Sequence, residues 1–380
     1  MIFQRILPHY RIGFFKKLIR TFPSAKIIYG QPYKNETLKN ESMIDTLHFQ
    51  QCRNLYFDKT GKVFLSGIYS MLFRQRPRVI ISVFNTGNLN IAMLFMLRFV
   101  YKYKLILWSF GYDPVRGFNP EKNSSDKVRL YYSQKADAVL FYWKNGLDKV
   151  AEYSKRKDHY FVAPNTLDTD KLTELRKQFE ITGKQKIKGE LGIDTDYHFI
   201  YVGRLIADKQ ADLLLKAFKI VEDKNENCSL TIIGDGPERS NLERLKDELD
   251  IKKIFFAGEI TDDNLTGKWI FASDAFIMPG RLGLSVVHSF CFGTPVISQS
   301  KDYNYHGEGI GYLHDNLNGI LVPDGDTGAL ASAMIKIVID KDFSAALRKN
   351  AIQTTENECS VQNMISGFKN AIEYVSNTAH

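Results

Sequence analysis

Short apolar runs alternate with longer segments of helical periodicity, and this alternation restricts the fold more than any other feature of the sequence. The second half shows it best: HFIYVG is typical of a buried strand, and ADLLLKAFKIV follows with apolar residues at 213, 214, 217, 218 and 221. Further strands are expected at SLTIIG, IFFAG, DAFIM, TPVI and GILV, and further helices at NLERLKDEL, LSVVHSFCF and GALASAMIKIV. Strands that alternate with helices form βαβ units, so we expect parallel sheets covered by helices.

The first half has the same alternation. Strands are predicted at Lys26–Tyr29, Arg78–Val83, Lys104–Trp108, Ala138–Phe141 and Tyr160–Val162, with helical patterns between them such as Leu89–Val100 and Lys144–Ser154.

A chain of 380 residues exceeds the usual size of one domain. We predict an α/β fold of two Rossmann-like, doubly wound domains that face a central cleft. The boundary should fall in the polar stretch Thr166–Lys188, which gives domains of residues 1–175 and 176–361, with a last helix at 362–376 that returns to the first domain. In such sheets ligands bind at the carboxyl ends of the strands.

The segment VGRLIADK is the first candidate binding motif. Gly203 ends a strand, Arg204 follows in the loop, and Lys209 lies just before a helix. Two cations beside a helix N-terminus suit a diphosphate, and they can stabilise a departing diphosphate without a metal. Basic pairs are also common in loops that bind nothing, so the pair alone does not decide the function.

The segment MPGRLGLSVVHSFCFGTPVI is the second candidate. Its glycines make a tight turn into a helix that starts near Leu284, where free amides and the hydroxyl of Ser285 can hold a phosphate. His288 lies one turn further along, within reach of a ribose or a phosphate. A lone helical histidine is more often structural.

These two motifs, with IIGDGPE and FAGEI between them, resemble the ordered pattern of the retaining glycosyltransferase family 4, which has the GT-B fold. The resemblance covers residues 198–325 well, and FFKKL, ADAVLFYW and APNTLD agree in order. It implies a nucleotide-diphosphate sugar donor bound by the second domain and a saccharide or lipid-linked saccharide acceptor bound by the first.

The resemblance also implies residue roles. Arg204 and Lys209 match the pair that binds the donor diphosphate and acts in catalysis. Gly283, Leu284 and Ser285 match the amides at the distal phosphate. His288 stands where most members have the second glutamate of an EX7E motif, which binds the ribose. The remaining donor-binding positions implied are Gly13, Gly236, Glu259 and Ile260.

Two departures from the family pattern stand out. The position of the first EX7E glutamate is occupied by Gly280 or is lost in a shortened loop, as in a subgroup with the pattern PGxxGLxxxHSxxFGTPVI. In the first domain, Phe110 stands where many members have a histidine. Asp113 or His9 are candidates to compensate, and Arg11 joins them as an acceptor or cleft candidate. His306 and Glu308 are candidates to border the donor sugar or phosphates.

The resemblance implies a retaining hexosyl- or deoxyhexosyltransferase that works by front-face substitution, needs no cofactor and is metal-independent. Its setting is bacterial surface polysaccharide or glycolipid assembly. Three alternatives remain: a GT-B epimerase or phosphorylase, a non-catalytic GT-B subunit that binds a partner enzyme or a membrane, and a nucleic-acid-binding protein. The last lacks any recognised binding module.

The net charge of +8 predicts attraction to polyanions. In IGFFKKLIRTF, basic and apolar residues interleave at helical spacing, which suits either a helix on an anionic membrane surface or an ordinary amphipathic helix. The four cysteines form no CxxC pair, and the sequence starts without a signal-peptide pattern. We therefore expect a cytoplasmic protein, and the membrane alternative for this helix would place it on the inner face of the cell membrane.

Overall fold

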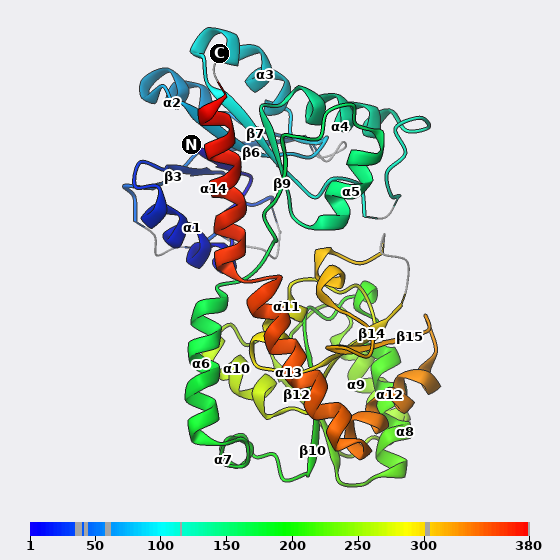
Figure 1. Cartoon of the computed structure of the whole chain (residues 1–380). Coiled ribbons are helices and arrows are strands. Elements are labelled where there is room, and N and C mark those ends of the chain that lie inside the picture. Colours follow the sequence, from blue (N-terminus) through cyan, green and yellow to red (C-terminus); the bar gives the residue numbers. More distant parts are fainter. Residues whose placement is uncertain (35–39, 42–44, 58–61, 115, 301–304, 379–380) are drawn as a thin grey trace. The chain divides into compact units, whose positions relative to one another are not determined.

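The computed structural model describes residues 1–34, 40–41, 45–57, 62–114, 116–300 and 305–378, and the chain divides into two compact units (Figure 1). The first unit comprises Met1–Asp168 and Val361–His380, and the second comprises Thr169–Ser360. The division falls after Asp168 rather than after residue 175, because α6 (Thr169–Thr182) packs against helices of the second unit.

A parallel sheet of order β3-β2-β1-β6-β7-β8-β9 forms the first unit among the described residues. Its strands are β1 (Ile2–Gln4), β2 (Ile27–Tyr29), β3 (Phe49–Gln51), β6 (Val79–Val83), β7 (Lys104–Ser109), β8 (Ala138–Phe141) and β9 (Tyr160–Val162), and β4 (Asn54–Phe57) and β5 (Lys62–Leu65) form a separate antiparallel hairpin. The five predicted strands are confirmed, whereas β1 and β3 had not been predicted.

Helices cover both faces of this sheet. They are α1 (His9–Thr21), α2 (Ile68–Gln75), α3 (Asn90–Tyr101), α4 (Ser124–Lys135), α5 (Lys144–Tyr153) and α14 (Val361–Asn377). On one face α1 and α14 pack around Phe14, Trp108 and Phe368, and on the other α2 to α5 pack around a second apolar cluster that includes Leu72 and Leu94. The last helix of the chain is thus part of the first unit (Figure 1).

Helix α1 turns its apolar residues into the core of the first unit. Phe14, Phe15 and Leu18 are buried, and Arg11 is buried with them. Lys17 pairs with Asp168 at 2.5 Å, while Lys16 and Arg20 are exposed. The apolar face that would meet a membrane is therefore buried in the core.

The second unit is built on a parallel sheet of order β12-β11-β10-β13-β14-β15 in the described ranges. Its strands are β10 (Tyr197–Val202), β11 (Cys228–Ile233), β12 (Ile254–Gly258), β13 (Ala275–Met278), β14 (Val296–Gln299) and β15 (Gly319–Val322). Besides α6, its helices are α7 (Lys184–Glu190), α8 (Ala211–Lys224), α9 (Arg239–Glu248), α10 (Asp263–Ala272), α11 (Ser285–Cys291), α12 (Thr327–Ile339) and α13 (Lys341–Asn357), with short 3-10 helices η1 (Ala207–Lys209) and η2 (Glu308–Tyr312).

The α/β architecture with two doubly wound parallel sheets is confirmed, and every element predicted in the second half is present. The strands β10, β13 and β14 are largely buried, which explains why their sequences are continuous apolar runs rather than alternating ones. Within the described ranges, no helix combines the length and the apolar character needed to cross a bilayer.

Candidate functional site

The strand order of the second sheet reverses between β10 and β13. From β10 the chain proceeds to β11 and β12 on one side, and from β13 to β14 and β15 on the other. The loops at the carboxyl ends of β10 and β13 therefore leave in opposite directions, and such a point is where open parallel sheets bind ligands. VGRLIADK follows β10, and the glycine turn follows β13, so both predicted motifs flank this point.

The two loops are joined by backbone hydrogen bonds. The N–H of Gly280 donates to the carbonyl of Lys209 at 3.1 Å, and the N–H of Arg281 donates to the carbonyl of Asp208 at 2.8 Å. A Cβ at position 280 would lie 2.2 Å from the Asp208 carbonyl oxygen. No side chain fits there. The close approach of the loops after β10 and β13 therefore requires a glycine at this position, where most family members have the first EX7E glutamate.

Three cations gather at this junction. Lys209 is largely buried, and its ammonium group donates to the carbonyl of Arg281. The pKa of Lys209 is lowered to about 8, mainly by burial and also by the charges of Arg204 and Arg281, while the carboxylate of Asp208 acts in the opposite direction. A bound anion would relieve this repulsion between cations, so the junction is suited to phosphate groups.

The start of α11 offers hydrogen-bonding groups to the same region. In the part of the chain that the structure describes, the backbone N–H groups of Gly283, Leu284 and Ser285 have no protein acceptor. The hydroxyl of Ser285 and Nε2 of His288 are buried with no hydrogen-bond partner among the described residues, and their spacing puts them on one face of the helix. A hypothetical Cβ at Gly283 meets no atom within 4 Å, so a ligand can approach the backbone there.

His288 is neutral under physiological conditions, because burial lowers its pKa to about 4. The carboxylate of Asp263 acts in the opposite direction and the ammonium of Lys171 in the same direction, which places the ring near the start of α10. Glu259 and Ile260 lie just before that helix, at the carboxyl end of β12. The structure thus brings the predicted ribose and base positions into one neighbourhood of the second unit.

Gly236 and His306 shape the loops. A Cβ at Gly236 would lie 2.3 Å from the carbonyl oxygen of Leu205, so this glycine lets the loop after β11 pack beside Arg204. The buried ring of His306 accepts from the N–H of Leu282 at 3.1 Å through Nδ1, and Nε2 lies 3.2 Å from the carbonyl of Gln299. His306 therefore supports the glycine turn, and its expected place beside the donor stays a prediction. Glu308 begins η2.

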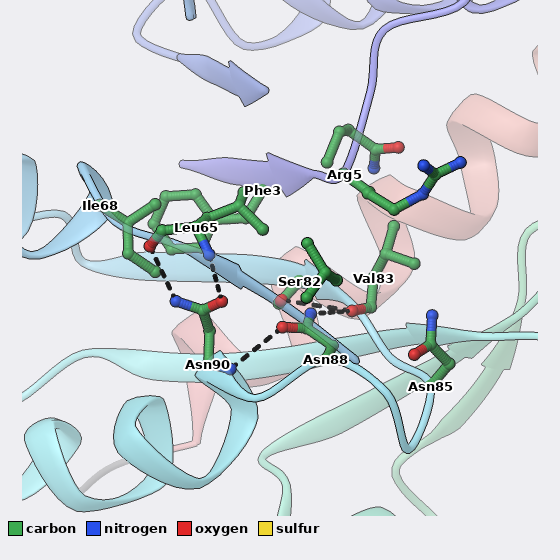
Figure 2. Close-up of a pocket in the computed structure, with 11 residues that line it drawn as sticks. Phe3, Arg5, Leu65, Ile68, Ser82, Val83, Asn85, Asn88 and Asn90 are labelled. Atoms are coloured by element: carbon green, nitrogen blue, oxygen red, sulfur yellow. Dashed lines mark hydrogen bonds between the residues drawn. The ribbon is translucent and has the colours of Figure 1, made fainter. Parts of the chain in front are cut away.

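The strand order of the first sheet reverses between β1 and β6. A cavity of about 20 Å³ lies there, lined from β1, β5, β6 and the loop before α3 (Figure 2). Asn90 bonds both the N–H and the carbonyl of Leu65, and Asn88 donates to the carbonyl of Val83. The amides of Asn88 and Asn90 thus bond the protein's own backbone, whereas Nε2 of the buried Gln4 has no hydrogen-bond partner in the part of the chain that the structure describes.

Nothing in the sequence marked Gln4, Arg5 or Asn85 as candidates. The amides of Gln4 and Asn85 carry no charge, Arg5 belongs to no motif, and only the strand order brings these three residues to one edge. Recognising Ile2–Gln4 as the central strand would have located them.

The predicted residues of the first loop have different surroundings. His9 contacts Glu41 through Nδ1 at 2.6 Å. Arg11 is buried with its guanidinium 4.4 Å from the ring centre of Trp108, and its Nη1 has no acceptor. A Cβ at Gly13 would lie 2.3 Å from a carboxylate oxygen of Asp168, so packing within the unit already requires this glycine.

Phe110 belongs to an aromatic cluster rather than to a polar site. Its ring lies 5.2 Å from Tyr112 and 5.3 Å from Trp143, and its carbonyl accepts from Nε1 of Trp143. Asp113 pairs with Arg116 at 3.0 Å. The described residues contain no group of three or more His, Cys, Asp or Glu side chains arranged to hold a metal ion.

Comparison with known proteins agrees with this geometry. Residues 183–354 match the family model described as glycosyl transferases group 1. The chain is 24% identical over 315 residues to an uncharacterized glycosyltransferase, MJ1059 of Methanocaldococcus jannaschii, covering 73% of this chain and 75% of the relative. It is 30% identical over 202 residues to the lipopolysaccharide core biosynthesis glycosyltransferase LpsE of Rhizobium meliloti, covering 51% of this chain and 56% of that relative.

Among solved structures, the fold is similar to that of Anabaena Alr3699/HepE in complex with UDP, with a TM-score of 0.69 and 13% identity over 98% of this chain and 99% of that one. The chain spans three quarters of the first of these curated relatives and little more than half of the second. The fold is that of the GT-B class, and these sequence matches are to glycosyltransferases.

Proposed function

We propose that this protein transfers a hexosyl or deoxyhexosyl group from a nucleotide-diphosphate sugar to a saccharide or lipid-linked saccharide, with retention of anomeric configuration. The observation that carries the proposal is the junction at the switch point of the second sheet. There Lys209, Arg204 and Arg281 gather beside three backbone N–H groups that have no acceptor among the described residues.

The proposed reaction breaks the bond between C1 of the sugar and the diphosphate oxygen, and the electron pair leaves with the diphosphate. The acceptor hydroxyl oxygen forms its bond to C1 on the same face, and its proton passes to the leaving phosphate. Arg204 and Lys209 stabilise the negative charge that grows on the leaving group, which is the largest catalytic effect that fixed charges provide. In this proposal no protein nucleophile and no metal takes part.

The donor would be oriented by the groups around α11. The amides of Gly283 to Ser285 would meet the distal phosphate, and the neutral ring of His288 would accept a hydrogen bond from a ribose hydroxyl, in place of the family's usual glutamate. Glu259 and Ile260 would contact the base. Complexes of Anabaena HepE with UDP and with UDP-glucose support a donor of this chemical class.

For the acceptor and the setting, we propose assembly of a bacterial surface polysaccharide or glycolipid, at the inner face of the cell membrane. The similarity to the lipopolysaccharide core enzyme LpsE supports this choice. The side chains of the first unit that would contact the acceptor are proposed at its switch point, with Arg11 as a further candidate.

The test is a thermal-shift and calorimetric screen of the full chain against UDP, GDP, dTDP, CMP and their sugar conjugates. We expect one nucleotide-diphosphate family to raise the unfolding temperature, because a ligand that binds only the folded state stabilises it. The variant Arg204→Ala/Lys209→Ala should lose this shift, whereas Lys216→Ala, an exposed lysine of α8 in the same unit, should keep it.

A product assay then separates catalysis from binding. Transfer of labelled sugar from the donor so identified to an extractable lipid-linked acceptor, with an α-to-α or β-to-β outcome by NMR, would support the enzyme. Binding of no nucleotide at all would contradict the proposal and favour the non-catalytic GT-B subunit.

A further inference from the structure

A long stretch of the first unit carries basic residues and no acidic ones. Between Asp58 and Asp113 the sequence has no Asp or Glu, and it has eight Lys and Arg residues: Lys59, Lys62, Arg74, Arg76, Arg78, Arg98, Lys102 and Lys104. Helices α2 and α3 lie within this stretch. Surfaces built from it are therefore positively charged, without nearby carboxylates of the same segment to neutralise them.

Helix α3 has two apolar faces. Ile91 and Leu94 are buried against the sheet, whereas Met96, Phe99 and Val100 are 62%, 76% and 72% exposed. The spacing of these three positions places them in one outward stripe along the helix. A helix of a water-soluble surface usually has polar residues there, so this stripe requires an explanation.

Helix α2 adds to the same surface. Phe73 is 63% exposed, and Arg74 and Arg76 at the end of the helix are exposed beside it. Both helices pack on the same face of the sheet, and Figure 1 shows both on the upper side of the first unit. We define the α2/α3 patch as the apolar residues Phe73, Met96, Phe99 and Val100 with the basic residues Arg74, Arg76 and Lys102.

The cations of the α2/α3 patch are available to a ligand. Within the described ranges none of Arg74, Arg76 and Lys102 forms an ion pair with a carboxylate, whereas Arg98 on the same helix is paired with Asp137 at 3.5 Å. Among the described residues, these exposed cations therefore have no carboxylate partner.

We propose that the α2/α3 patch docks the first unit on the surface of an anionic lipid bilayer. The apolar side chains enter the boundary between headgroups and acyl chains, and the arginines and Lys102 meet lipid phosphates. A second copy of this chain fits less well, because a two-fold interface would place the same unpaired cations opposite one another. The docking does not depend on which sugar or acceptor the enzyme uses.

This surface replaces the one that the sequence suggested. The basic residues of α1 accompany apolar residues that are buried in the core, so α1 has charge without an insertable face. The α2/α3 patch has both. Helix α1 and the α2/α3 patch lie on opposite faces of the same sheet, so variants of the two surfaces form a matched pair for experiment.

The experiment is co-sedimentation of the full chain with vesicles of phosphatidylglycerol and phosphatidylcholine in equal parts, and with pure phosphatidylcholine vesicles. We expect binding to the anionic vesicles and weak binding to the neutral ones. Met96→Ser/Phe99→Ser and Arg74→Gln/Lys102→Gln should each lower the partition coefficient about tenfold or more. Lys16→Gln/Arg20→Gln on α1 and Ile339→Ser, an equally exposed apolar side chain of the second unit, should leave it unchanged.

A second variant reports insertion directly. Trp108, Trp143 and Trp269 are buried, so Phe99→Trp adds one exposed indole whose emission should shift to shorter wavelength on anionic vesicles. Unchanged emission on vesicles, loss of binding in the α1 variant with retention in the patch variants, or a dimer in solution that Phe99→Ser dissociates would each overturn the proposal. Nucleotide binding should be the same in all variants, which separates failure of docking from failure of the donor site.

Discussion

The two sheets reverse their strand order in the same way, but the loops at the two reversal points carry different chemistry. In the second unit the loops after β10 and β13 bring together three cations and a backbone with unpaired N–H groups. In the first unit the loops after β1 and β6 bring together amides and a single guanidinium around a cavity of about 20 Å³. Most of these amides bond the protein's own backbone, and the guanidinium of Arg5 donates to the hydroxyl of Tyr56 at 3.3 Å.

This difference separates the contribution of topology, which is room for a ligand, from that of the loops, which is the chemical groups that bind it. A reversal of strand order leaves room at the carboxyl edge of either sheet. The cations of the second unit suit a phosphate ligand, whereas neutral amides suit hydroxyl groups. If the comparison is right, changes at the carboxyl edge of the second sheet should alter donor affinity and turnover but not acceptor affinity. Changes at the carboxyl edge of the first sheet should alter acceptor affinity but not donor affinity.

The largest effect is expected from Lys209. Lys209→Met keeps an apolar stem in a buried position and removes the charge, so turnover should fall by about 10²- to 10³-fold, the usual cost of removing one group that stabilises developing charge. The measurement is steady-state kinetics with saturating acceptor. Lys216→Met, which removes an exposed lysine of the same unit, serves as control. Equal losses in both variants would mean that net charge, and not the junction, binds the donor.

The pH dependence tests the same group without a substitution. Because the pKa of Lys209 is lowered to about 8 in the free protein, and a bound diphosphate would raise it, donor affinity should be constant below about pH 8 and fall about tenfold per pH unit above it. Calorimetric titrations with the nucleoside diphosphate measure this slope. The residues that line the first-unit cavity include no lysine or histidine, so the Michaelis constant for the acceptor should not follow this titration. A flat donor profile would remove Lys209 from the binding site.

Gly280 and Gly283, three positions apart in the turn after β13, should respond to alanine substitution in opposite ways. Gly280→Ala places a Cβ against the Asp208 carbonyl, so the free energy of unfolding should fall by about 1–3 kcal/mol. Gly283→Ala meets no protein atom, so stability should stay the same or rise by about 0.5 kcal/mol. Donor affinity should nevertheless fall about tenfold in Gly283→Ala, because the methyl group occupies the space that a phosphate would approach. Thermal melts with and without nucleotide distinguish the two, and unchanged affinity in Gly283→Ala would show that the ligand lies elsewhere.

The candidate residues at the carboxyl edge of the second sheet were easier to predict from the sequence than those at the carboxyl edge of the first sheet, for physical reasons. Charged residues and glycines at Arg204, Lys209 and Gly283 are conspicuous because few structural needs produce them together. Strand β1 was not predicted, and without it Gln4 could not be assigned to the carboxyl edge of a sheet. Helices α1 and α3 show a related limit: amphipathic spacing reveals an apolar face, but only packing decides whether that face meets the protein's own core.

A smaller effect is expected at His288 and Ser285. Each presents a buried polar atom without a partner, so replacing either by alanine removes no internal hydrogen bond and should hardly change the unfolding temperature. Donor affinity should fall about fivefold in each variant, in line with about 1 kcal/mol for one hydrogen bond. Ser289→Ala on the same helix is the contrast, because its hydroxyl donates to the Thr294 carbonyl at 2.7 Å and its loss should lower stability instead.

The smallest expected effect lies at the first edge, and it tests the other half of the comparison. Nε2 of Gln4 is buried without a partner beside the cavity, so Gln4→Met removes an unsatisfied donor and should leave stability unchanged or slightly raised. If that amide serves an acceptor hydroxyl, the Michaelis constant for the acceptor should rise about threefold to fivefold, while donor affinity stays constant. Initial rates at varied acceptor, paired with nucleotide titrations, measure both quantities. A change in nucleotide affinity without a change in acceptor kinetics would reverse the assignment, because it would place a donor group at the edge that carries no cationic junction.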